Sequence, residues 1–262
     1  RYFDWHVTSV LNFSQNYTKS FKVPDFRVYH SGNLYYHIQS AIENATAGDT
    51  VYVWNGTYHE NVIIDRGVTL LGNGTVNTII DGVGNTAIRV TGKYATIANL
   101  SVKGATNLSG TNRFGILVNE SGGALNATGL RLYDNFHGIY FSTTKKWGSR
   151  VADSIIESNT NTGFGVNTAT GLRIENCTIN NNGNDGINLD TTSNVLIYGN
   201  HIHNNSGHGI RWNVGGTGNG VHHNRIIDNS GDGIRTAYVS AGSFTYNEIR
   251  NHNTGFGGGR GI

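Results

Sequence analysis

A column of glycines that recurs about every 23 residues constrains this chain more than any other feature. The column comprises Gly115, Gly138, Gly163, Gly186, Gly209, Gly233 and Gly255. Between these glycines, short alternating apolar runs are separated by Asn and Gly turns, a pattern typical of stacked β-strands. A unit this short holds about three strands and cannot bury its own apolar face until neighbours stack on it. The sequence therefore predicts an all-β fold, a parallel β-helix solenoid of roughly eight to nine coils.

Two series of asparagines follow the same period. The first is Asn135, Asn159, Asn182, Asn205 and Asn229, and the second is Asn176, Asn200, Asn224 and Asn247. Asn tolerates the left-handed backbone conformation of sharp turns, and its amide can donate to one coil and accept from the next. We expect both series to form hydrogen-bonded ladders that stabilise the turns.

The chain is expected to form one elongated domain preceded by an arm. Residues 1–30 are irregular and rich in aromatic residues, and they contain the only proline, Pro24. Residues 31–262 are assigned to the β-helix, and apolar spacing within 35–46 predicts a short amphipathic helix that caps the first coil. The segment 254–262 resembles the opening of another coil. An aromatic arm at one end and an open β edge at the other favour end-to-end self-association.

Composition excludes several classes of protein. Only 14 % of residues are charged and the net charge is +2, too small to indicate nucleic-acid binding. No apolar run approaches the roughly 20 residues that cross a bilayer. The single cysteine, Cys177, cannot form an internal disulfide and is interpreted as a small buried apolar group. No cofactor is expected.

Asn-x-Ser/Thr sequons favour secretion into a glycosylating pathway, hence a secreted or cell-surface protein. The alternative is that Asn, Ser and Thr are abundant simply because they are turn residues. The candidate glycosylation sites are Asn12, Asn16, Asn44, Asn55, Asn73, Asn99, Asn107, Asn119, Asn126, Asn176 and Asn204.

Residues that could carry chemistry lie just before the glycine column. Successive periods place His137, Thr162, Asp185, His208, Asp232 and Thr254 there. Because coils stack about 4.8 Å apart, Asp185, His208 and Asp232 are expected to be close enough to share protons or charge. They are the candidate catalytic residues. The alternative interpretation is that they are ordinary turn residues of the repeat.

A second set of polar residues follows the glycines on the outward face of the same strands. Guanidinium groups bind sugar carboxylates or sulfates bidentately, so this face is a candidate carbohydrate-binding surface. Its residues are Asp190, Arg211, Arg235 and Tyr140. A metal site was also considered, because His201, His203, His222 and His223 cluster in sequence, but they fall in different columns of the repeat. No metal site is therefore predicted.

The N-terminal part of the repeat region resembles the opening of pectin-lyase-like right-handed parallel β-helix proteins. The resemblance rests on residues 38–45 (IQSAIENA), 48–51 (GDTV), 56–60 (GTYHE) and 70–72 (LLG), and it extends through the repeats to residue 262. It implies a right-handed β-helix, and it points most closely to non-catalytic or carbohydrate-binding surface proteins of that superfamily. The superfamily also contains lyases, hydrolases and epimerases, so the resemblance does not select a function.

The candidate catalytic column is similar to that of polygalacturonases only in part. Residues 207–209 (GHG) match one polygalacturonase motif, residues 184–186 (NDG) lack one carboxylate of another, and Thr162 replaces the acid of a third. Signatures of mannuronan epimerases, pectate lyases and pectin methylesterases are incomplete. We therefore expect a self-associating surface protein that forms a filament or cell-envelope layer. A carbohydrate-binding β-helix and a polysaccharide hydrolase or lyase remain as alternatives.

Overall fold

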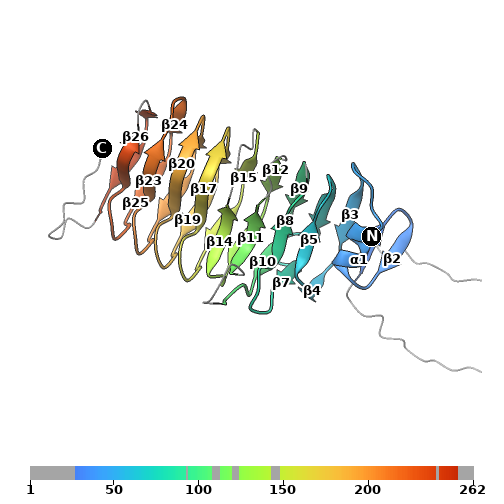
Figure 1. Cartoon of the computed structure of the whole chain (residues 1–262). Coiled ribbons are helices and arrows are strands. Elements are labelled where there is room, and N and C mark those ends of the chain that lie inside the picture. Colours follow the sequence, from blue (N-terminus) through green and yellow to red (C-terminus); the bar gives the residue numbers. More distant parts are fainter. Residues whose placement is uncertain are drawn as a thin grey trace, which may run out of the picture.

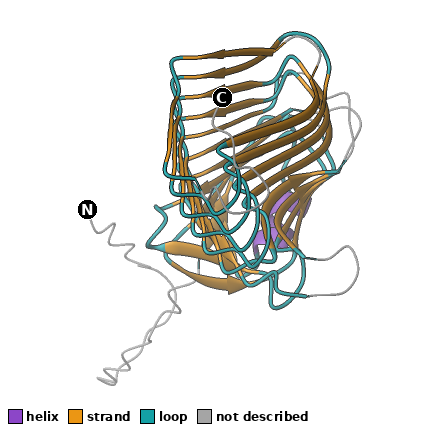
Figure 2. Cartoon of the chain, turned by 90° about the vertical axis from the view of Figure 1, so that its left-hand side faces the viewer, coloured by secondary structure: helices purple, strands orange, loops and turns teal. Residues whose placement is uncertain are grey.

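The computed structural model describes residues 27–92, 94–107, 113–119, 124–142, 148–239 and 242–252. They form a parallel β-helix in which each coil contributes one strand to each of three sheets, here sheets A, B and C. Figure 1 shows the coils following one another along the molecule, and Figure 2 shows the strands of each sheet stacked in register. The predicted all-β solenoid is thus confirmed, with about eight turns.

The strands of the three sheets have the following bounds. Sheet A contains β1 (Val28–His30), β2 (Asn33–Tyr35), β3 (Thr50–Val53), β6 (Thr69–Gly72), β9 (Ala95–Ala98), β12 (Leu125–Thr128), β15 (Arg150–Ala152), β18 (Arg173–Glu175), β21 (Leu196–Tyr198), β24 (Asn219–His222) and β27 (Gly242–Thr245). Sheet B contains β4 (Gly56–His59), β7 (Thr78–Asp81), β10 (Ser101–Lys103), β13 (Arg131–Tyr133), β16 (Ile155–Glu157), β19 (Thr178–Asn180), β22 (His201–His203), β25 (Arg225–Ile227) and β28 (Glu248–Arg250). Sheet C contains β5 (Val62–Ile64), β8 (Ile88–Val90), β11 (Phe114–Val118), β14 (His137–Phe141), β17 (Phe164–Thr170), β20 (Ile187–Ser193), β23 (Ile210–Gly215) and β26 (Ile234–Val239).

A hairpin and a helix close the N-terminal end of the described solenoid. Strands β1 and β2 pair antiparallel, and β1 also pairs antiparallel with β3. Residues 27–30, which we assigned to the arm, therefore belong to sheet A or lead into it, whereas residues 1–26 lie outside the described residues. The helix α1 (Ile38–Glu43) is shorter than the expected range 35–46, because Tyr35 still belongs to β2 and Asn44 already caps the C-terminus.

The first predicted asparagine ladder lies inside the turn between sheets B and C. The Asn182 side chain donates from Nδ2 to the backbone oxygen of Ile156 and to Oδ1 of Asn205, at 3.2 and 2.9 Å. Its own Oδ1 accepts from the backbone N–H and the Nδ2 of Asn159. The same contacts repeat from coil to coil among the buried Asn135, Asn159, Asn182, Asn205 and Asn229.

The glycine column is explained by close approach to this ladder. A Cβ atom on Gly163 would lie 2.7 Å from Nδ2 of Asn182 and 3.0 Å from the backbone oxygen of Gly186. Similar clashes would occur at Gly138, Gly186 and Gly209. Only glycine allows the chain to leave the ladder turn and enter sheet C without separating the coils.

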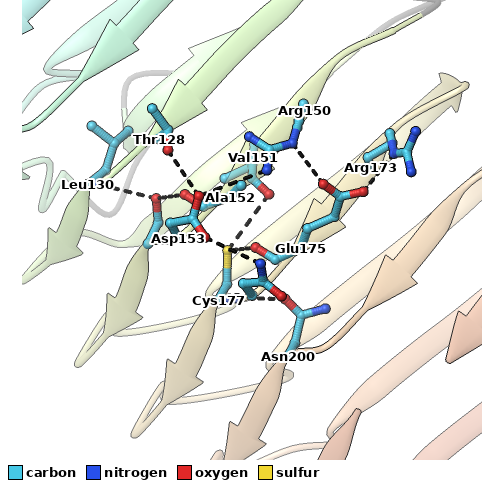
Figure 3. Close-up of polar contacts among 12 residues, drawn as sticks. Thr128, Leu130, Arg150, Val151, Ala152, Asp153, Arg173, Glu175, Cys177 and Asn200 are labelled. Carbon is cyan, nitrogen blue, oxygen red and sulfur yellow. Dashed lines mark hydrogen bonds and ion pairs between the residues drawn. The ribbon is translucent and has the colours of Figure 1, made fainter. Parts of the chain in front are cut away.

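The second ladder runs through the turn between sheets A and B, but one expected member was wrong. Asn200 accepts the backbone N–H of Cys177 at 2.9 Å (Figure 3). The ladder continues through Asn224 and Asn247. Asn176 precedes the ladder position and adopts a left-handed φ of 52°. Cys177 fills the ladder position, and burial raises the pKa of its thiol to about 12, as expected for an unreactive apolar group.

Replacing Asn182 with Ala should strongly destabilise the protein, because it leaves buried backbone groups without partners. We expect a loss of about 2–4 kcal/mol in the free energy of unfolding, measured by urea denaturation. The exposed Asn167 on β17 provides the control, and its replacement by Ala should change stability by less than about 0.5 kcal/mol. Equal stabilities of the two variants would contradict a structural role for the ladder.

Candidate functional site

The outer face of sheet C carries the residues that the sequence nominated for carbohydrate binding. The strand register places Tyr140, Gly165, Asn188, Arg211 and Arg235 opposite one another in one column. Asp190 lies two residues beyond Asn188 on the same outward face of β20 and is half-buried. The structure thus brings the four nominated residues to one face, and their role in binding stays a prediction.

The structure also stacks Asp185, His208 and Asp232 on successive coils, as the repeat predicted. Oδ1 of Asp185 accepts the backbone N–H of His208 at 2.8 Å. Nδ1 of His208 accepts the backbone N–H of Asp232 at 2.8 Å and lies 3.5 Å from Oδ2 of Asp232. The side chains of Asp185 and His208 therefore each bind the backbone of the next coil. Thr254, the next residue expected in this column, lies outside the described residues.

This arrangement disfavours Asp185 as a general acid or base. Its side chain is only 1 % exposed, and its Oδ2 is buried without a hydrogen-bond partner among the described residues. His208 is more accessible. Burial lowers the pKa of its imidazole, although the carboxylates of Asp185 and Asp232 act in the opposite direction. The catalytic assignment of the three residues stays a prediction, and their observed contacts are those of turn residues.

A hollow of about 350 Å³ lies on the same face, beside the polar column that precedes the glycines. Its walls combine aromatic rings, side-chain amides and groups of both charges. They are formed by Arg113, Phe114, His137, Tyr140, Asn161, Thr162, Gly165, Val166, Asn184, Asn188 and Asp190. Polar groups that converge beside an aromatic wall can fix the orientation of a bound ligand.

The aromatic wall of the hollow is a packed cluster. Phe114 stacks on His137 and Tyr140 with ring centroids 5.2 and 4.8 Å apart. The rings of Phe136 and His137 make an edge contact with centroids 4.8 Å apart, and the guanidinium of Arg113 lies over the Phe136 ring, 4.5 Å from its centroid. Phe114 on β11 pairs in register with His137 on β14, so the two rings lie above one another on successive coils. The cluster is thus an ordered platform with a cation beside it.

A glycine in the outward column makes room for Tyr140. A Cβ atom on Gly165 would lie 2.4 Å from Cδ2 of the Tyr140 ring. The missing side chain allows the ring to lie over β17. Burial, with a further contribution from Asp190, raises the pKa of Tyr140, so its hydroxyl is protonated at neutral pH and can donate a hydrogen bond.

Charged groups continue along sheet C beyond the hollow. Asn213 donates from Nδ2 to Oδ1 of Asp190 and accepts from Nε of Arg211 at 3.1 Å. The Arg235 guanidinium lies 3.4 Å from Nε2 of His208. Arg211 and Arg235 are exposed and point outward from adjacent coils. They extend the polar face towards the C-terminal coils.

A second, wider depression of about 720 Å³ lies at the far ends of the long strands β17, β20, β23 and β26. It is lined by hydroxyl-bearing and small residues: Thr168, Ala169, Thr170, Thr191, Thr192, Ser193, Val214, Gly215, Gly216, Ala237 and Tyr238. Because this lining lacks charged side chains, the smaller hollow is the better candidate for specific recognition.

The exposed sequons of the described residues lie outside the strands of sheet C. In the described part of the chain, the asparagines of seven are exposed: Asn44, Asn55, Asn73, Asn99, Asn126, Asn176 and Asn204. Asn107 and Asn119 are half-buried, and Asn12 and Asn16 lie outside the described residues. None of the exposed seven belongs to a strand of sheet C. Glycans at these positions would leave the hollow accessible.

The histidines considered for metal binding are not arranged as a metal site. His201 stacks on His203 with centroids 4.1 Å apart, and Nη1 of Arg225 lies 3.0 Å from Nε2 of His201. Nδ1 of His222 is within 2.8 Å of the Thr245 hydroxyl. Among the described residues, no group of three or more His, Cys, Asp or Glu side chains could hold a metal ion.

Sequence reasoning missed Arg113 and Phe114 as members of the site. Phe114 occupies the polar column that precedes the glycines, but as an apolar residue it did not match the pattern. The only available signal was its position directly before Gly115. The packing of Tyr140 over Gly165 was not visible in the sequence, because it depends on the contact between two coils.

Comparisons with known proteins agree with this architecture. Residues 114–262, more than half of the chain, match the family described as the right handed beta helix region. The chain belongs to this right-handed β-helix family. A search of curated protein sequences found no match. No helix of the described residues is long and apolar enough to span a membrane.

Solved structures with the same fold act on polysaccharides, as their names state. The A-module of the Azotobacter vinelandii mannuronan C-5 epimerase AlgE6 is 19 % identical with a TM-score of 0.62, over 82 % of this chain and 72 % of that one. Pectate lyase Pel9A is 14 % identical, with the same TM-score of 0.62 and coverages of 82 % and 72 %. The periplasmic alginate epimerase AlgG is 12 % identical with a TM-score of 0.53, over 76 % and 47 %. At these identities the likeness shows the fold alone.

His137 should make stability depend on pH. Burial, assisted by the charge of Arg113, lowers its pKa from 6.5 to about 4. The unfolded chain then binds a proton between these values and the folded protein does not, so the free energy of unfolding should fall as the pH drops through this window. The full effect is about 3 kcal/mol.

The variant His137→Phe should remove this part of the pH dependence, because Phe retains the stacking on Phe114 and does not titrate. Urea denaturation at pH 7 and pH 4.5 provides the measurement. The wild type should lose more stability between the two pH values than the variant. Parallel losses would show that His137 does not carry the effect.

Proposed function

We propose that this chain is a carbohydrate-binding β-helix that holds an acidic polysaccharide along the outer face of sheet C. The observation that carries the proposal is the hollow beside Tyr140, where aromatic rings, amides and a guanidinium converge on about 350 Å³ of space. Sugar rings have apolar faces that stack on aromatic side chains and hydroxyls that bond amides and carboxylates. Tyr140 and Phe114 provide the first kind of contact, and Asn188 and Asp190 provide the second.

Guanidinium groups spaced along this face favour an acidic polymer. Arg113 lies at the aromatic end of the hollow, and Arg211 and Arg235 lie on later coils of the same sheet. Coils repeat at about 4.8 Å, so Arg113 and Arg211 are separated by about 19 Å, enough for several sugar residues. Arginine binds carboxylate and sulfate groups bidentately. The structural neighbours named for mannuronan, alginate and pectate support an acidic ligand as the first class to test.

A secreted or cell-surface location belongs to the same proposal. Polysaccharides of this kind lie outside the cytoplasm, and one structural neighbour is named as periplasmic. The exposed sequons support the placement, because their glycans would cover other faces and leave sheet C open.

Removing the Tyr140 ring should weaken glycan binding. We expect Tyr140→Ala to raise the Kd for uronic-acid oligosaccharides by roughly tenfold, since one aromatic stacking contact is worth about 0.5–1.5 kcal/mol. Gly165→Ala should also weaken binding, because its Cβ would displace the Tyr140 ring without removing it. Calorimetric titration after a screen of acidic and neutral glycans provides the measurement.

The control for these variants is Tyr52→Ala, which removes a 44 % exposed ring on sheet A. It should bind like the wild type. Product analysis on the same oligosaccharides distinguishes a binder from an enzyme. Cleavage that survives Asp185→Asn would exclude Asp185 as the catalyst. If no glycan of the screened panel binds, the proposed function is contradicted.

Self-association into a filament or envelope layer is a second candidate function. Within the described residues, β26, β27 and β28 are the last strands of their sheets and present backbone groups that no further strand pairs. Such edges favour pairing with another chain. The opposite end is covered by α1 and the β1–β2 hairpin, so a head-to-tail contact would use two different surfaces.

Electron microscopy of the protein purified from its native source tests this candidate. End-to-end association should give filaments that disappear when residues 1–26 are removed, while circular dichroism keeps the β-helix signal. The truncation spares β1, which belongs to sheet A. Peptide mass spectrometry of the same sample reports which sequons carry glycans. Isolated rods at high protein concentration would contradict self-association.

A further inference from the structure

An exposed stack of aromatic rings lies at the turn between sheets A and B of the C-terminal coils. Tyr198 meets His223 with ring centroids 5.1 Å apart, and His223 meets Tyr246 at 5.0 Å. Tyr198 is 41 % exposed and Tyr246 is 80 % exposed. The stack lies at a different corner of the coil from the hollow on sheet C, and nothing in the proposed function uses it.

The backbone beneath the stack is unfavourable for the residues that occupy it. His223 and Tyr246 have φ angles of 58° and 57°, in the left-handed region. The same turn position on the two preceding coils is occupied by Asn176 and Gly199, at 52° and 65°. Bulky residues in this region cost about 1–2 kcal/mol, whereas Gly and Asn adopt it readily. The chain therefore places aromatic rings where the fold alone favours a smaller residue.

The stacking of three exposed rings over this backbone, rather than the backbone cost alone, points to a role other than folding. The side chains around the stack are polar. His222 and Thr245 bond to each other at 2.8 Å beside it. On the coil before Tyr198, the carboxylate of Glu175 accepts from Arg150 and Arg173 at 2.7 and 2.6 Å (Figure 3).

The apolar area of the stack and the polar side chains around it indicate whether a protein or a sugar would bind here. A stable protein interface buries about 800 Å² on each partner and has an apolar centre. Three rings with a polar rim provide much less apolar area. They match a sugar ring, whose apolar face covers one or two side chains while its hydroxyls reach the rim.

We propose that Tyr198, His223 and Tyr246 form a second saccharide-binding site, separate from the hollow on sheet C. The ligand is a pyranose unit of a glycan that stacks on the exposed rings. The hydroxyls of the two tyrosines and the side chains of His222 and Thr245 supply its hydrogen bonds. Two sites on different faces would allow one molecule to crosslink glycan chains.

The test uses the full chain with Tyr140→Ala, which weakens binding in the hollow and keeps the two proposals distinguishable. His223→Gly and Tyr246→Gly place in the turn the residue that Gly199 already provides one coil earlier. Binding of neutral and uronic-acid hexasaccharides is followed by saturation-transfer NMR and calorimetry. We expect each variant to raise the Kd about fivefold or more, with a melting temperature equal to or above that of the parent.

Tyr94→Gly is the matched control. Tyr94 is 71 % exposed and also left-handed, with a φ of 57°, but it lies in the N-terminal half of the solenoid, before β9. Its replacement should affect the backbone in the same way and leave binding unchanged.

Three outcomes would overturn the second site. In the first, no hexasaccharide binds the Tyr140→Ala protein, or binding is unaffected by the two stack variants. In the second, the stack variants melt at clearly lower temperature than the control, which would make the stack a structural device. In the third, sedimentation shows an oligomer that the stack variants lose, which would assign the rings to a contact between copies.

Discussion

The hydrogen bond from one buried asparagine amide to the next is the interaction on which the rest of this structure depends. In the turn between sheets B and C, a ladder Asn such as Asn182 satisfies a backbone N–H and a backbone carbonyl of the preceding coil. The amides must lie in register, so the coils cannot slide or rotate relative to each other. The glycine column follows from this constraint, because a Cβ atom would collide with the ladder amides and with the next coil.

Once the register is fixed, every outward side chain of sheet C belongs to a column that runs along the solenoid. Columns bring together residues that are about 23 positions apart and give a ligand a surface with a repeat close to 4.8 Å. The same geometry brings Asp185, His208 and Asp232 into contact on successive coils. Asp185 and His208 each accept a hydrogen bond from the backbone of the next coil. The features that suit recognition lie where the repeat is broken, at Phe114, Tyr140 and Gly165.

The two aromatic surfaces depart from the repeat in different ways. In the hollow, an apolar ring replaces a polar turn residue and a glycine replaces an outward side chain. At the turn between sheets A and B, His and Tyr occupy left-handed positions that carry Gly, Asn or Asp on earlier coils. Both departures expose rings at a cost to local packing or backbone energy. Repeat proteins keep their fold through such changes, because each coil is held mainly by its neighbours.

The periodic features of the fold could be predicted from the sequence, since a ladder turn demands Asn and the step after it demands Gly. These requirements predicted the parallel coils and the first ladder. They also predicted the outward face with Asp190, Arg211, Arg235 and Tyr140, and the contacts among Asp185, His208 and Asp232. The prediction failed where two neighbouring positions satisfy the same rule. Asn176 and the residue after it both lie in the turn, and only the inter-coil bond to Cys177 shows which one occupies the ladder.

The sequence by itself determined the class of fold, the period and the register, because these depend on residue types that recur along the chain. The tertiary structure decided which side chains form surfaces. The ring of Tyr140 lies over Gly165, Arg113 lies over Phe136, and Tyr198 meets His223 only because successive coils stack at a fixed distance. A contact between coils depends on the shapes of two non-repeating residues and on the space between them. A one-dimensional pattern contains neither.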